Sequence, residues 1–250
     1  MNVALYGRPK RWAMTERGRK RAHQDKTGFS VKASGIRVEG DSVVITVDET
    51  CAPIPRPLKG TIRLRPNTVS ETVYPLDGAK EHFWRPVAPA APIEVEMDAP
   101  SIKWRGTGYL DMNYGVRALE ATFAHWDWMR VDLGGGNSAV LYETAVRDSA
   151  NARLALLKKA DGTTEMFDPP PLHDLPRTLW RVRRAAWSEN GPPQLQRTLE
   201  DTPFYVRTEL ITTLFGERHS AIQESLSLAR FKSPIVRLML PFRMPRLGNL

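Results

Sequence analysis

The sequence predicts an all-β protein made of antiparallel strands, arranged as barrels or sandwiches in two parts, with few short helices. Several stretches alternate polar and apolar residues with a period of two, as strands with one buried face do. The 20 prolines among 250 residues favour many short elements joined by turns over a helical bundle. Helical patterns are confined to two short segments.

Three strands are expected in the N-terminal part of the chain, at residues 42–49 (SVVITVDE), 60–66 (GTIRLRP) and 93–98 (IEVEMD). Each is bounded by Pro, Gly or Asp, residues that favour turns. The third lies in a proline-punctuated stretch, residues 89–104, which is typical of a connection. We therefore expect a first β domain over residues 1–100 and a second over 101–250, with the active site near their junction.

An antiparallel meander is expected in the C-terminal part. Residues 126–133 (WDWMRVDL) place Trp126 and Trp128 on one face of a strand and Met129 on the other. Glycine-rich residues follow, and then two more apolar segments that begin at residues 139 and 152. The second of these contains an Asp-Gly pair, the strongest short signal for a hairpin turn.

Two short helices are expected. Residues 115–126 (GVRALEATFAHW) place Leu119 and Phe123 four positions apart, on one helix face. Residues 233–242 (SPIVRLMLPF) begin with a serine suited to an N-cap and a proline suited to the first helical position.

The composition excludes several classes of protein and site. The single cysteine, Cys51, excludes an internal disulfide framework and a thiolate metal cluster, and it favours a reducing compartment. The longest apolar runs fall far short of the roughly 20 residues of a membrane-spanning helix. The five histidines are dispersed without metal-ligand spacing, so no metal and no cofactor is expected.

The formal net charge is +8, and basic residues concentrate at 8–21, 181–184 and 237–246. No zinc-finger, helix-turn-helix or RNA-binding pattern accompanies them, so no nucleic-acid partner is expected. Apolar residues alternate with the charges in the last of these segments, which favours peripheral contact with an anionic membrane surface. A solvated basic face is the alternative.

The segment WRGTGYLDMNYG, residues 104–115, resembles a glycine-rich nucleotide loop. However, Asp111 occupies the position of the third glycine of G-x-G-x-x-G, where its charge would repel a pyrophosphate. The alternatives are a plain turn shaped by the glycines, with Asp111 as a turn or capping residue, and the wall of an active site.

The sequence pairs polar and aromatic residues two positions apart, so that each pair shares one face of a strand. If the pairs line one cavity, they form an aromatic pocket that contains a carboxyl, a phenol and an imidazole. The alternative is that the tryptophans are ordinary core residues. The pairs are His82 with Trp84, Tyr109 with Asp111, and Trp126 with Trp128, and Trp104 lies nearby in the sequence.

Six segments of the chain match one known family: residues 2–19, 48–66, 106–130, 200–210, 224–236 and 239–246. Through them the chain resembles the carotenoid 1,2-hydratase family, also called hydroxyneurosporene synthase. The resemblance implies two lipocalin-like domains and a cofactor-independent lyase that adds water to the C1–C2 double bond of neurosporene or lycopene. It also implies that a further N-terminal stretch precedes residue 1 in other members, so the first domain is expected to be incomplete.

The family's H-x-W and Y-x-D pairs map onto His82 and Trp84 and onto Tyr109 and Asp111, with Asp111 as the favoured proton donor. Burial would keep Asp111 neutral, because desolvation raises a carboxyl pKa. Tyr109 or His82 would then act on the attacking water.

Three tryptophans, Trp104, Trp126 and Trp128, are expected to contact the substrate. Faces of Trp84, Trp126 or Trp128 would stabilise a cation at C1. The expected location is cytoplasmic, at the periphery of the inner or photosynthetic membrane of a bacterium. The alternatives are a non-catalytic carotenoid- or isoprenoid-binding protein and a related enzyme acting on another isoprenoid or polyketide.

Overall fold

The structure is a computed structural model and describes residues 1–147 and 150–243. Antiparallel strands dominate it and the helices are short, so the predicted all-β class is confirmed. The chain divides into two compact units. The first holds Met1–Pro66, Ala91–Gly108 and the residues from Arg237 onward, and the second holds Asn67–Ala90 and Tyr109–Val236. The expected division at residue 100 stays a prediction.

The first unit contains a two-stranded pair, β1–β2, and the antiparallel run β3 to β7. Its core includes Ala13, Val47, Leu58 and Val95, and Ile45 and Ile62 pack against it. The strands predicted at residues 42–49 and 60–66 are present, although the first has buried residues on both faces and the second ends at Leu64. The strands are β1 (Asn2–Leu5), β2 (Arg11–Met14), β3 (Ala22–Gln24), β4 (Gly28–Val31), β5 (Ser34–Glu39), β6 (Ser42–Thr50) and β7 (Pro57–Leu64), with a 3-10 turn at Arg19–Arg21.

Two long strands, β9 (His82–Ala99) and β10 (Ile102–Gly115), have residues in both units and adjoin each other in sheet order. The expected connection over residues 89–104 is therefore wrong, because nearly all of it is strand. Pro86 and Pro89 can belong to β9 because of the partners on one side of that strand. There β9 pairs with β8 (Tyr74–Pro75) only before Pro86 and with β7 only after Pro89. No hydrogen bond between strands on that side therefore requires the N–H group that proline lacks.

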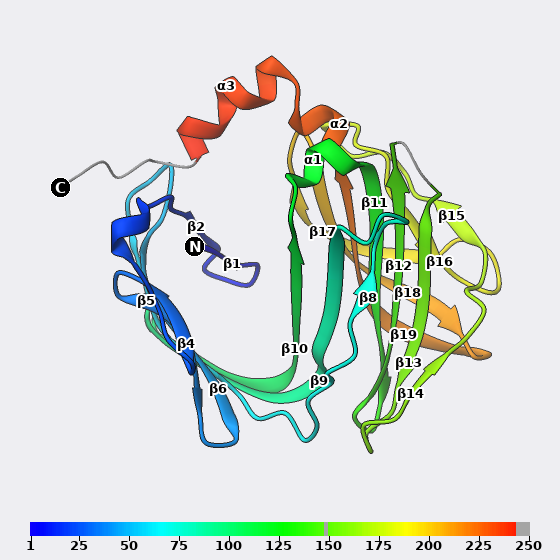
Figure 1. Cartoon of the computed structure of the whole chain (residues 1–250), viewed down its shortest axis with the longest axis horizontal. Helices are drawn as coiled ribbons and strands as arrows, with labels where there is room; N and C mark the ends of the chain where they lie inside the picture. The colour runs from blue at the N-terminus through cyan, green and yellow to red at the C-terminus, as the bar shows by residue number, and fades with distance from the viewer. Residues whose placement is uncertain (148–149, 244–250) are drawn as a thin grey trace. The chain divides into compact units, whose positions relative to one another are not determined.

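The second unit is built on a seven-stranded antiparallel sheet with the order β14-β13-β12-β11-β19-β18-β17 (Figure 1). The predicted meander is confirmed, and Gly162 of the Asp-Gly turn has a φ of +92°. The strands are β11 (Phe123–Gly134), β12 (Asn137–Val146), β13 (Ala152–Lys158), β14 (Thr164–Met166), β17 (Gln194–Asp201), β18 (Tyr205–Leu214) and β19 (Glu217–Ser227), and β15 (Leu172–Asp174) pairs separately with β16 (Ala185–Trp187). Within the described residues, neither sheet order closes into a barrel.

The described residues contain three short α-helices: α1 (Leu119–Thr122), α2 (Leu228–Phe231) and α3 (Pro234–Arg243). The helix expected over residues 115–126 is wrong for most of its length, because only α1 is helical and Phe123 begins β11 instead of sharing a helix face with Leu119. Ser233 Oγ accepts a hydrogen bond from the backbone N–H of Val236 at 3.3 Å, which confirms the predicted N-cap of α3. No helix in the described ranges has the length and apolar character of a membrane-spanning segment.

The seven-stranded sheet buries both faces, because alternate residues of β11 supply two different cores. Met129 and Val131 pack on one side with Leu141, Trp187 and Leu210. The opposite side carries an aromatic cluster around Trp84, Phe123, Trp128 and Tyr142. The two-residue period predicted for residues 126–133 is therefore correct, and the aromatic side holds the candidate site.

Candidate active site

Asp111 lies on β10 and accepts two hydrogen bonds on the same carboxylate oxygen. Trp84 Nε1 donates to Oδ2 at 2.8 Å, and the Tyr109 hydroxyl donates to Oδ2 at 2.9 Å. An indole N–H can only donate, so Oδ2 is an acceptor in this arrangement. When the carboxyl is neutral, its proton therefore sits on Oδ1.

Burial raises the pKa of Asp111 above its ordinary range. Hydrogen bonds from Trp84 and Tyr109 and the charge of Arg207 act in the opposite direction, but they do not outweigh burial. Burial, reinforced by the charge of Asp111, also raises the pKa of Tyr109 well above that of an ordinary phenol. Tyr109 therefore keeps its proton and remains a hydrogen-bond donor to Asp111.

Aromatic rings surround this carboxyl. The ring centres of Tyr109 and Trp128 are 5.2 Å apart, and those of Trp84 and Tyr142 are 5.5 Å apart. Trp126 lies next to Tyr142, with 6.2 Å between ring centres. The structure thus brings together five of the residues expected from the sequence: Trp84, Tyr109, Asp111, Trp126 and Trp128.

Tyr142, Glu224 and Arg207 belong to the same surroundings, although the sequence did not indicate them. Trp128 of β11 is directly opposite Tyr142 of β12 on one side and Glu224 of β19 on the other, and Glu224 is directly opposite Arg207 of β18. Directly opposite residues point to the same face of a sheet, so these four side chains form a row. Arg207 Nε donates to Glu224 Oε1 at 2.8 Å.

His82 is buried at the edge of the cluster, where its ring meets Phe123 with 4.9 Å between ring centres. Its Nδ1 lies 2.9 Å from Asp77 Oδ2, and its Nε2 lies 3.1 Å from the carbonyl oxygen of Arg117. Burial acts to raise the pKa of Asp77, but hydrogen bonds from Glu81 and His82 outweigh it and lower the pKa. The two ring nitrogens of His82 thus face Asp77 and the carbonyl of Arg117, and not Asp111.

The glycines of WRGTGYLDMNYG do not shape a turn, because the whole segment lies within one continuous strand, β10. A Cβ atom on Gly115 would lie 2.5 Å from His82 Cδ2 and 2.8 Å from the carbonyl oxygen of Glu81. Gly115 is therefore required for the close approach of β10 to His82. The plain-turn interpretation is wrong, and Asp111 is a strand residue.

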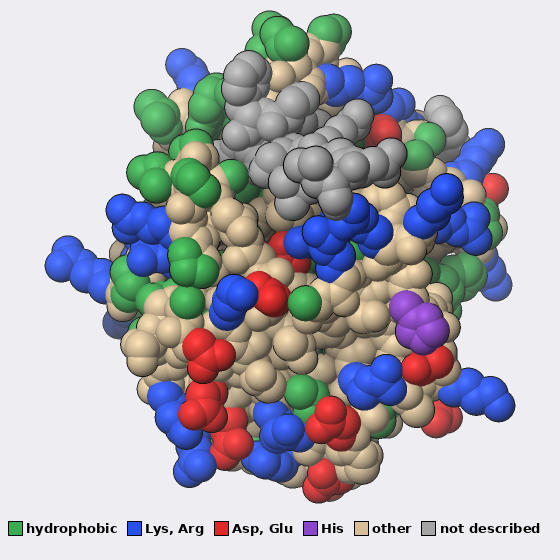
Figure 2. All heavy atoms as spheres, turned by 90° about the vertical axis from the view of Figure 1, so that its left-hand side faces the viewer, with side chains coloured by type: hydrophobic (Ala, Val, Ile, Leu, Met, Phe, Trp, Pro, Cys, Tyr) green, Lys and Arg blue, Asp and Glu red, His purple; other side chains and the backbone are tan. Residues whose placement is uncertain are grey.

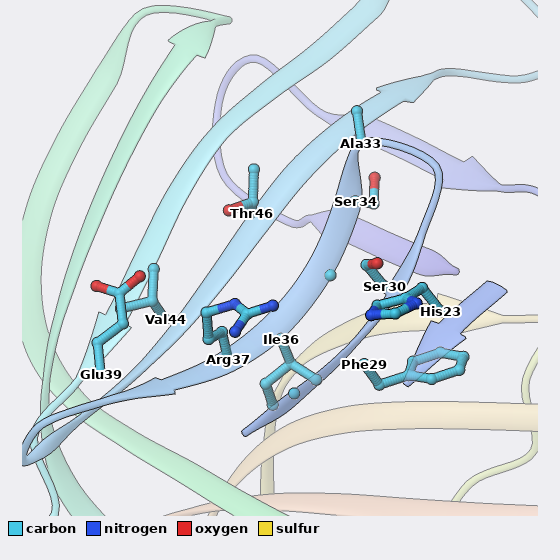
Figure 3. Close-up of a pocket in the computed structure, with 12 residues that line it drawn as sticks. His23, Phe29, Ser30, Ala33, Ser34, Ile36, Arg37, Glu39, Val44 and Thr46 are labelled. Atoms are coloured by element: carbon cyan, nitrogen blue, oxygen red, sulfur yellow. The ribbon is translucent and has the colours of Figure 1, made fainter. Parts of the chain in front are cut away.

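Trp104 belongs to the first unit and is 48% exposed, so its expected role in substrate binding stays a prediction. The first unit also has a hollow of about 170 Å³ lined by strands β3 to β6 (Figure 3). His23, Phe29 and Arg37 line this hollow, and none of the expected site residues does.

The described residues contain no group of three or more His, Cys, Asp or Glu side chains arranged to hold a metal ion.

On the face drawn in Figure 2, Lys and Arg side chains are interspersed with Asp and Glu side chains. Among the described side chains drawn there, the two signs of charge are mixed.

Comparison with known proteins gives consistent matches. The family model described as carotenoid hydratase CrtC matches residues 1–249. The acyclic carotenoid 1,2-hydratase of Thiocapsa roseopersicina is 45% identical over 252 residues, which cover 100% of this chain and 62% of the relative. That of Rubrivivax gelatinosus is 41% identical, covering 98% and 61%, and that of Cereibacter sphaeroides is 36% identical, covering 98% and 88%. The chain thus spans about three fifths of the length of the first two relatives.

One solved structure supports the fold. A protein of Nitrosomonas europaea, provisionally assigned as an AttH, matches with a TM-score of 0.59 at 16% sequence identity, covering 82% of this chain and 71% of that chain. This likeness concerns the fold alone, which is lipocalin-like as the sequence resemblance implied.

Proposed function

The chain belongs to the carotenoid hydratase family, and we propose that it adds water to the C1–C2 double bond of an acyclic carotenoid such as neurosporene or lycopene. The observation that carries this proposal is the partly buried carboxyl of Asp111, which lies among aromatic rings and accepts hydrogen bonds from two donors on one oxygen. Hydration of a trisubstituted alkene needs an acid that holds its proton near neutral pH and delivers it to carbon.

Asp111 is the proton donor in this proposal. Its raised pKa favours the neutral acid in the free protein, and the proton on Oδ1 is transferred to C2 of the substrate. As the carboxylate forms, Trp84 and Tyr109 are already placed to donate to Oδ2, so the negative charge is stabilised without rearrangement.

Protonation at C2 leaves a tertiary cation at C1. The faces of Trp84, Trp126 and Trp128 stabilise such a cation through their quadrupoles, an interaction worth roughly 2 kcal/mol or more in a desolvated site. Tyr142, which packs against Trp84 and Trp126, adds a fourth aromatic ring to this wall.

His82 and Tyr109 are positioning residues in this scheme. Tyr109 orients Asp111 and donates to it, and its own pKa is too high for it to act as a base near neutral pH. His82 holds the start of β9 through Asp77 and Arg117, and Trp84 projects from the same face two residues later.

The proposal includes contact between α3 and a membrane surface, from which a long apolar substrate would enter. Ile235 and Leu238 lie three positions apart on α3, hence on one side of the helix, and are 72% and 73% exposed. Arg237, an exposed residue of the same helix, provides charge for anionic headgroups. Of the other two basic residues expected in this tail, Arg243 ends α3 and Arg246 lies outside the described residues.

Incubation of the chain with lycopene or neurosporene in membranes, followed by mass spectrometry, tests the activity. Formation of a product heavier by one water supports hydration. Carotenoid binding without any such product favours the alternative, a lipocalin-like carotenoid- or isoprenoid-binding protein.

A further inference from the structure

We propose that Glu224, held by Arg207, positions the attacking water and takes its proton, so that the site works with two carboxyl groups in different roles. This inference rests on the proposed hydration and adds the base to it. Paired carboxyls whose surroundings keep one neutral and the other ionised are a common arrangement for acid and base chemistry.

The fold places Glu224 on the same side of the sheet as Asp111 and its donors. Glu224 and Trp128 are directly opposite each other on β19 and β11, and Cβ atoms of such pairs are typically about 5 Å apart. The Tyr109 ring packs on Trp128, and its hydroxyl binds Asp111. Arg207 also lies close enough to Asp111 to lower its pKa. The Arg207–Glu224 pair therefore borders the proton donor.

The ion pair leaves one oxygen of Glu224 open. Arg207 donates from both Nε and Nη2, and both bonds go to Oε1. Oε2 accepts no hydrogen bond from the residues that the structure describes, and the Glu224 side chain is only 20% exposed. The guanidinium thus orients a carboxylate whose second oxygen is available to a water molecule.

Trp128 offers the complementary group for that water. Its Nε1 is buried and has no hydrogen-bond partner within the described part of the chain. Buried N–H groups are nearly always satisfied, by protein or by ordered water. A water molecule that accepts from Trp128 Nε1 and donates to Glu224 Oε2 satisfies both groups and lies beside the aromatic wall.

The two residues expected to act as the base are less suitable. The Tyr109 hydroxyl donates to Asp111, and both ring nitrogens of His82 face Asp77 and Arg117. Glu224, by contrast, is held by Arg207 through Oε1 alone, so its Oε2 is geometrically available to a water molecule.

The reaction balances with these two carboxyls. The π electrons of C1–C2 form a C2–H bond with the proton of Asp111, which leaves a carboxylate and a cation at C1. A lone pair of water forms the C1–O bond, and one proton of that water moves to Glu224. Proton transfer from Glu224 to Asp111 through solvent then restores both groups, for a net addition of one water.

The test compares Glu224→Gln, Arg207→Gln and a matched control, Glu143→Gln, in the hydration assay. Glu143 also pairs with an arginine, Arg153, and its side chain is 19% exposed, but it follows Tyr142 directly in β12 and so faces the other side of the sheet. Glu224→Gln should lower kcat by about 10²- to 10⁴-fold with little change in KM, as loss of a general base does. Arg207→Gln, which breaks the same ion pair but keeps the carboxylate, should lose less activity, and the control should match the wild type.

Two results would overturn the assignment of Glu224 as the base. Near-wild-type kcat in Glu224→Gln would show that the ion pair is inert. Equal losses of kcat in Glu224→Gln and Arg207→Gln would show that the ion pair is only structural. If the Gln variant does not fold, Glu224→Asp decides. A folded Asp variant with lowered kcat and unchanged KM supports the proposal, and full activity overturns it. If the wild-type chain forms no hydrated product, the proposed function itself fails and the role of Glu224 falls with it.

Discussion

The indole N–H of Trp84 donates to Asp111 Oδ2 at 2.8 Å and so joins β9 to β10 where the carboxyl is partly buried. This hydrogen bond favours the ionised form of Asp111, whereas burial favours the neutral form and prevails. The result is an acid that keeps its proton until the substrate takes it, next to donors that stabilise the carboxylate once it forms.

Trp84→Phe keeps an aromatic ring but removes this donor. The pKa of Asp111 should rise further, because one of the groups that lower it is lost, and kcat near neutral pH should fall about tenfold, corresponding to roughly 1.4 kcal/mol. The pH–rate profile should lose activity at a higher pH than that of the wild type. Trp180→Phe, at an exposed tryptophan, is the control and should leave the profile unchanged.

The stability of the protein should also depend on Asp111. A folded-state pKa above the unfolded value means that this group contributes stability at pH values below its unfolded pKa of about 3.9 and loses that contribution as pH rises through the raised folded pKa. Urea unfolding measured across this range should show a decline that is reduced in Asp111→Asn. Parallel curves for the two proteins would show that Asp111 does not titrate as described.

Gly115→Ala tests the close approach of β10 to His82. The added Cβ would lie 2.5 Å from the His82 ring and 2.8 Å from a backbone oxygen, so something must shift. We expect a loss of roughly 1–3 kcal/mol, or about 2–4 °C in Tm for each kcal/mol. Gly7→Ala, where no atom lies within 4 Å of the added carbon, should leave Tm nearly unchanged.

The exposed side of α3 should govern membrane contact. Replacing Ile235 and Leu238 together by serine removes two exposed apolar side chains of α3 without changing charge. The affinity for vesicles of anionic lipid, measured by co-sedimentation, should fall about 100-fold or more, because each apolar side chain contributes roughly 1.5–3 kcal/mol when fully buried. Replacing Leu179, an exposed leucine outside α3, by serine is the control. Unchanged co-sedimentation of the double variant would remove α3 from this role.

The period-two pattern of the sequence predicted much of this site. Residues two apart on a strand share a face, so Tyr109 and Asp111, and likewise Trp126 and Trp128, could be assigned to common surfaces before their neighbours were known. Their convergence on one cluster depends on which strands become neighbours, which the local pattern does not contain.

The register of distant strands explains what the sequence did not indicate. Glu224 and Arg207 become neighbours of Trp128 only because β19 pairs with both β11 and β18, and a shift of one residue would turn them to the other face. Gly115 was misinterpreted for a related reason. A glycine required by a close approach to another strand carries the same local signal as a glycine in a turn.

The role of Asp111 as proton donor is tested most directly by mass spectrometry of lycopene incubated in membranes with the wild-type chain and with Asp111→Asn. Asparagine has nearly the same size and still accepts from Trp84 and Tyr109, but it has no acidic proton to deliver. We expect a product heavier by one water with the wild type and its loss with the variant, while carotenoid binding persists. Hydration that survives in Asp111→Asn would show that Asp111 is not the proton donor.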